Sequence, residues 1–184
     1  MTTFALLLGP PLLSAALALA VQPYRRLVGR TNVWLSLVSL GAAVSLWRHV
    51  LAGHVVTSGP EEFLRADALS VLLALCVSLV GALSAWLGPG LHDDGYDGAQ
   101  ARKFRVYGNL FTLTMLFAVT TNNLGFMWIA IEATTITSAM LIPLHVTKAS
   151  VEASWKYILI GSVGIALAFG GTVLGYFDFV SLVG

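Results

Sequence analysis

Residues 124–143 read LGFMWIAIEATTITSAMLIP, a stretch of membrane length in which Glu132 is the only charged residue. At about 1.5 Å of rise per residue, eight steps from Leu124 place Glu132 roughly 12 Å into a hydrocarbon layer about 30 Å thick. Inserting a carboxylate there costs about 2.5–3.5 kcal/mol, which proteins tolerate where the side chain faces protein, water or a partner charge. The stretch predicts a transmembrane helix with a functional acidic group near its middle.

The rest of the chain has the same apolar character. Of its 184 residues, 57% are hydrophobic and 10% are charged. Apolar runs of near-membrane length recur along it, and together they predict an all-α polytopic membrane protein with about six transmembrane helices. We expect these helices near residues 4–21, 32–47, 68–87, 106–121, 124–143 and 155–175. No connection between them is long enough for a soluble domain.

Several classes of site are excluded by the sequence. The first apolar run lacks a basic region and contains Pro10 and Pro11, so we interpret it as a retained helix rather than a signal peptide. Cys76 is the only cysteine, which excludes an intrachain disulfide and a cysteine-held cluster. Residues 88–98 are rich in glycine and aspartate but do not match the calcium-loop template, which favours a solvated loop. We expect no metal, no cofactor and no nucleic acid bound by this chain.

The basic residues predict the orientation of the chain. They gather in alternate connections, which the positive-inside rule assigns to the cytoplasm. These residues are Arg25, Arg26, Arg30, Arg102, Lys103, Arg105, Lys148 and Lys156. Both ends of the chain are then outside, and the expected location is the inner or plasma membrane.

Composition divides the chain near Arg105. Residues 1–105 hold three Leu/Ala/Val-rich helices that we interpret as a scaffold, whereas residues 106–184 hold the more polar fourth to sixth helices. Hydroxyls in membrane helices bond either their own backbone or a neighbouring helix, and here they could also serve a proton wire. The hydroxyls concerned are those of Thr112, Thr114, Thr120, Thr134, Thr135, Thr137 and Ser138.

Three titratable groups are candidates for a proton path. Burial favours a neutral carboxyl and a nearby positive charge favours its ionised form, so Glu132 could exchange a proton; the alternative is a neutral Glu132 that donates an interhelical hydrogen bond. Lys156 follows Glu152 by four residues, which fits a helical ion pair or an interfacial anchor as well as a relay to Glu132 on the adjacent helix. His145 is a further candidate, or an inert interfacial histidine. Asp67 is typical of a helix N-terminus.

Residues 107–174 resemble the proton-conducting, antiporter-like membrane subunits of respiratory complex I, membrane-bound nickel-iron hydrogenases of the formate hydrogenlyase type, and multisubunit sodium/proton antiporters. The resemblance rests on motifs in the second half of the chain, supported by Asp67 to Ser70 at the start of the third helix. The motifs are Leu113 to Ala118 leading to Thr121-Asn122-Asn123, then Trp128 to Glu132, Glu152 to Tyr157 and Gly161 to Gly164.

The resemblance implies roles for two of the candidate residues. Glu132 matches the glutamate of the family's fifth helix, which helps to switch partner lysines, and Lys156 matches the lysine of the sixth helix. Family members have about fourteen helices in two inverted repeats. The chain stops after six, before the broken helix that carries the principal partner lysine, so it corresponds to the N-terminal portion only.

The sequence leaves three functional readings. The first is a non-redox membrane subunit, or the N-terminal part of one, in a proton-translocating oxidoreductase complex of hydrogenase or NADH–quinone oxidoreductase type. Its partners would be other membrane subunits and a peripheral redox arm with metal clusters. The second is a component of a cation/proton antiporter or an inorganic-carbon transporter. The third is a truncated, noncatalytic assembly subunit.

Overall fold

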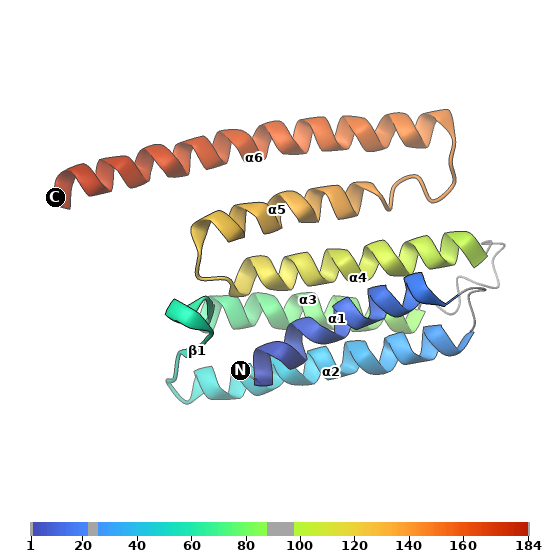
Figure 1. Ribbon diagram of the computed structural model, residues 1–184, viewed down its shortest axis with the longest axis horizontal. Coiled ribbons are helices and arrows are strands. Elements are labelled where there is room, and N and C mark those ends of the chain that lie inside the picture. Colours follow the sequence, from blue (N-terminus) through green and yellow to red (C-terminus); the bar gives the residue numbers. More distant parts are fainter. Residues whose placement is uncertain (1, 22–25, 88–97, 184) are drawn as a thin grey trace.

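The structure, a computed structural model, describes residues 2–21, 26–87 and 98–183. Within these residues the chain forms six α-helices, which confirms the polytopic all-α fold (Figure 1). They are α1 (Thr2–Ala20), α2 (Arg26–Leu51), α3 (Ala68–Leu87), α4 (Gly98–Thr120), α5 (Leu124–Ala139) and α6 (Lys148–Val183). Of the predicted loop at 88–98, residues 88–97 lie outside the described residues and Gly98 begins α4.

Within the described ranges, four helices are long and apolar enough to cross a membrane: α1, α2 from Val28 onward, α3 and α6. Helix α5 is apolar but shorter, at 16 residues. Helix α4 is less apolar because its first half carries Arg102, Lys103, Arg105 and Asn109. The charged residues of α4 therefore all lie in its first half.

Helix α5 ends at Ala139, four residues before the expected end at Pro143. Proline has no backbone N–H, so Pro143 cannot donate the helical hydrogen bond to the carbonyl of Ala139. That carbonyl accepts instead from the backbone N–H of Ile142 at 3.2 Å and from the hydroxyl of Ser154 at 2.8 Å. The last turn of α5 is thereby tied to α6.

The first four helices form an antiparallel bundle around an apolar core. Leu7, Leu46 and Leu116, from three different helices, are each fully buried in this core. Pro11 removes the hydrogen bond that the Leu7 carbonyl would accept within α1. The hydroxyl of Ser39 on α2 donates to that carbonyl at 2.6 Å. A proline in α1 thus becomes a point of attachment between two helices.

Helices α5 and α6 are added to one side of this bundle. Helix α5 packs on α4, and α6 packs on α5, so that α6 lies at the edge of the molecule (Figure 1). Ser154 is the one buried residue among those described in α6, whereas seven residues of α1 are buried. Apart from the face that contacts α5, α6 is exposed.

A short hairpin between α2 and α3 was not predicted. Strands β1 (Val56–Ser58) and β2 (Leu64–Ala66) pair antiparallel across the 3-10 turn η1 (Pro60–Glu62). Phe63 contacts Phe117 and Phe126 with ring centroids 6.1 and 5.1 Å apart, and its carbonyl accepts from the N–H of Asn122 at 2.8 Å. The hairpin therefore fixes the turn from α4 to α5. We call this end of the bundle the hairpin end.

Candidate proton-transfer site between α5 and α6

Helices α5 and α6 run antiparallel and meet along a row of small and polar side chains. The hydroxyls of Ser138 and Tyr157 lie 3.1 Å apart. Gly161 approaches Thr135 so closely that a Cβ atom at Gly161 would lie 2.9 Å from the Thr135 Cγ2. Towards the hairpin end, the row ends at an edge-to-face contact between the rings of Trp128 on α5 and Phe169 on α6, whose centroids lie 5.6 Å apart. This close packing positions the carboxyl group of Glu132 between the two helices.

Glu132 is half-buried on α5, in the middle of that row. The hydroxyl of Ser162 on α6 donates a hydrogen bond to Oε1 of Glu132 at 2.5 Å. This separation is at the short end of the range for O–H···O hydrogen bonds to carboxylate oxygens. An interhelical hydrogen bond is therefore present, but Glu132 accepts it, whereas the interpretation from the sequence had a neutral Glu132 as the donor. The bond orients the carboxyl group towards α6.

Lys156 does not contact Glu132 directly. The predicted helical ion pair is present: Lys156 Nζ contacts Glu152 Oε1, and both side chains are 55% exposed. Lys156 precedes Ser162 by six residues, which is about 9 Å along a helix axis. Glu132 and Lys156 therefore lie on adjacent antiparallel helices, as expected, but no hydrogen bond or ion pair joins their side chains.

His145 lies in the exposed turn between α5 and α6, at the end opposite the hairpin end. Its Nδ1 is 3.1 Å from Nε2 of Gln100 in the first turn of α4, an arrangement in which the amide donates to the ring. The backbone carbonyl of His145 accepts from the hydroxyl of Ser150 at 2.7 Å. His145 thus links the turn to α4, well away from Glu132.

The threonine hydroxyls of α4 and α5 bond their own helices. In each case the hydroxyl donates to a backbone carbonyl three or four residues earlier, which confirms the structural interpretation of these groups. The threonines are Thr112, Thr114, Thr120, Thr134, Thr135 and Thr137. Within 2–21, 26–87 and 98–183, no three His, Cys, Asp or Glu side chains gather as a metal site would require.

Sequence reasoning did not identify the α6 residues that complete the site. Ser154, Tyr157, Gly161 and Ser162 follow one another at steps of three, four and one, the spacing of one helical face. That pattern of small and hydroxyl-bearing residues was the available signal. It indicates a close helix contact, but it does not say which helix makes it.

The chain is similar to known membrane proteins in sequence and in fold. The chain is 31% identical over 122 residues to the "Hydrogenase-4 component F homolog" of Methylacidiphilum infernorum (isolate V4), a match over 64% of this chain and 26% of the relative. This similarity supports the resemblance to the complex I-like, antiporter-type membrane subunits. No family model matches the sequence.

The fold of this chain is also found in a solved structure. A chain of the membrane-bound sulfane sulfur reductase, an archaeal respiratory membrane complex, superposes with a TM-score of 0.75 at 23% identity. The match covers 94% of this chain and 36% of the archaeal one. The chain therefore spans about a quarter to a third of the length of these two proteins.

Proposed function

We propose that this chain is a membrane subunit, or the N-terminal part of one, of a proton-translocating oxidoreductase complex of hydrogenase or NADH–quinone oxidoreductase type, and that Glu132 takes up and releases a proton in its path. The observation that carries the proposal is the Glu132–Ser162 hydrogen bond, which holds a carboxyl group at the middle of an apolar helix pair. A membrane-embedded carboxyl that is held by a single hydroxyl retains lone pairs for water or for a partner group.

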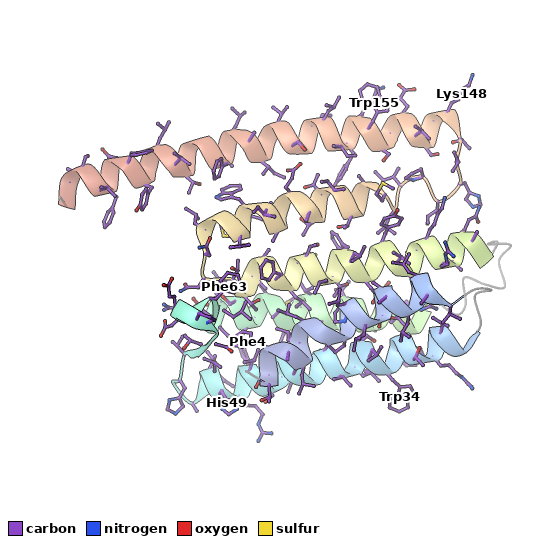
Figure 2. The ribbon with its side chains drawn as sticks, viewed as in Figure 1. Phe4, Trp34, His49, Phe63, Lys148 and Trp155 are labelled. Carbon is purple, nitrogen blue, oxygen red and sulfur yellow. The ribbon has the colours of Figure 1, made fainter. Side chains whose placement is uncertain are left out.

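The proposed path places residues 106–184 at the proton-conducting side and residues 1–105 as scaffold. Lys156 and Glu152 form the proposed relay near the start of α6, and His145 is a further member at that end. Figure 2 shows Trp155 and Lys148 on the side of α6 away from α5, so this surface is accessible to other subunits. In this proposal a neighbouring segment or subunit supplies the groups that join the Lys156 pair to Glu132.

The proposed partners and membrane location are those expected from the resemblance to antiporter-type membrane subunits. Other membrane subunits of a multisubunit complex and a peripheral redox arm with metal clusters are the proposed partners, in an inner or plasma membrane. The basic ends of α4 and α6 favour an orientation in which they face the cytoplasm and the N-terminus faces outside.

The experiment that tests the proposal is Glu132→Gln in the native complex, with Glu62→Gln as the matched control. The two variants make the same chemical change, but Glu62 is exposed in the turn of the hairpin. Proton uptake should be measured in inverted membrane vesicles while the complex turns over its redox reaction, together with the redox rate and the amount of assembled complex.

Glu132→Gln should lower the number of protons moved per electron severalfold with assembly intact, and Glu62→Gln should leave it unchanged. Unchanged proton uptake in Glu132→Gln would support the noncatalytic assembly subunit. Proton movement that depends on a sodium gradient, with no redox subunits co-purifying, would support the antiporter.

A further inference from the structure

The bundle of α1–α4 contains a layer of buried polar side chains between two apolar clusters. Ser14, Asn32 and Ser78 are only 4%, 5% and 2% exposed, and they come from three different helices. The larger apolar cluster lies toward the hairpin end and contains the fully buried Leu7, Leu46 and Leu116. The smaller one, formed by Ala18, Val28 and Val106, lies toward the opposite end.

The polar atoms of this layer have no partner among the described protein residues. The hydroxyl oxygens of Ser14 and Ser78 and the Oδ1 atom of Asn32 are buried and make no hydrogen bond to any described residue. Buried polar atoms in proteins are almost always bonded to protein or to ordered water, because an unbonded one is costly. Three such atoms in one layer therefore point to a shared ligand.

The unbonded atoms lie beside two adjoining small cavities. Ser14 and Ser78 line one of about 10 Å³, and Asn32 lines one of about 30 Å³ that also reaches Arg105. The two cavities share three lining residues, Gly81, Asn109 and Thr112. A water molecule needs roughly 10–15 Å³ and two to four polar partners. The spaces fit about one and about two waters.

Groups on the shared wall can complete the coordination of such waters. The hydroxyl of Thr112 donates to the Gly108 carbonyl at 3.0 Å, which leaves its own lone pairs to accept. Gly81 has no side chain, and a Cβ atom there would lie 3.2 Å from Thr112 Cγ2. Glycine at this position leaves space where the two cavities adjoin.

We propose that the α1–α4 bundle holds a cluster of ordered water molecules, bound by Ser14, Asn32 and Ser78 and continuous from the surroundings of Arg105 to the middle of the bundle. The cluster ends against the apolar residues Leu7 and Leu46, so it does not cross to the hairpin end. None of its lining residues comes from α5 or α6, which makes it a separate site from that of Glu132.

Radiolytic hydroxyl-radical footprinting of the native complex in its membrane tests this inference, because radicals formed from bound water oxidise the residues beside it. Pro11 lines the smaller cavity, and Leu7, one turn away on the same helix, is fully buried in the apolar cluster. The proposal expects oxidation of Pro11 severalfold faster than that of Leu7. Equal, negligible rates at both residues would overturn it.

Alanine variants give a second test whose sign separates a wet layer from a dry one. If water is bound, Ser78→Ala removes a partner of that water and should lower the thermal midpoint of the complex. If the layer is dry, Ser78→Ala removes an unbonded hydroxyl and should raise the midpoint, which would contradict the proposal. Ser39→Ala is the control: its hydroxyl has a protein partner, so the midpoint should fall in either case.

Discussion

Alanine at position 161 should separate α6 from α5 and weaken the hydrogen bond that holds Glu132. The added Cβ would lie 2.9 Å from Cγ2 of Thr135, whereas ordinary contacts lie at 3.4–4 Å. One of the two groups must therefore move by at least 0.5 Å. Thr135 is β-branched and lies within a helix, so it has few alternative rotamers. We expect α6 to take up much of the movement.

The movement should reach Glu132 because Ser162 is the next residue along α6. Its hydroxyl is 2.5 Å from Oε1 of Glu132, and O–H···O hydrogen bonds weaken beyond about 3.0 Å. Overpacking costs about 1–3 kcal/mol, while alanine in place of glycine within a helix contributes about 0.5–1 kcal/mol of stability. The expected net loss for Gly161→Ala is about 1 kcal/mol.

The assay is the thermal midpoint of the assembled complex, measured beside proton uptake per electron, with Gly164→Ala as the control. Gly164 is exposed on the same helix, and a Cβ there would meet nothing within 4 Å. Gly164→Ala should be neutral or slightly stabilising, whereas Gly161→Ala should lower both the midpoint and the proton yield. If the two variants behaved alike, the close α5–α6 contact would not exist as described.

Three further substitutions test other parts of the account. Ser162→Ala removes the donor to Glu132, so proton uptake per electron should fall with the complex still assembled. Ser162→Thr keeps a hydroxyl and should restore part of that uptake. Equal uptake in the wild type and both variants would remove Ser162 from the site. Lys156→Gln should change the free energy of unfolding by less than about 0.5 kcal/mol, because the ion pair of Lys156 with Glu152 is exposed. The same variant should lower proton uptake per electron. A large loss of stability would instead show a structural role for Lys156. Asp67→Ala should cost about 0.5–2 kcal/mol, because the carboxylate caps α3. The hydrogen bond that Asp67 accepts from the Ser70 N–H lowers the pKa of Asp67 from its usual 3.8. The stability difference between wild type and Asp67→Ala should therefore be complete above pH 3.8 and disappear as the pH falls through the lowered pKa. A stability difference that persists in acid would contradict the cap.

The apolar runs were sufficient to predict six helices, because an apolar segment of membrane length must either be buried against other helices or face lipid. The end of α5 was misplaced because hydropathy continues to Pro143, whereas the last helical hydrogen bond to the fourth residue back is donated by Met140. The hairpin was missed because its strands have three residues each, too short for a periodic signal.

The candidate site was predicted only in part. Glu132 could be identified because one carboxylate in an apolar helix is conspicuous on energetic grounds. Its partner Ser162 could not, because the pairing depends on the phase and register of two helices, which the sequence of either helix alone does not define. The exposure of the pair formed by Lys156 and Glu152 depends in the same way on what α6 contacts.

The most direct test of the central claim is infrared difference spectroscopy of the complex at rest and during turnover. A carboxyl group that changes its protonation state gives a C=O stretching band that appears or disappears and shifts in D₂O. The account predicts such a band in the wild type and in Glu62→Gln, and its loss in Glu132→Gln. A difference spectrum of Glu132→Gln identical to that of the wild type would show that Glu132 does not exchange a proton.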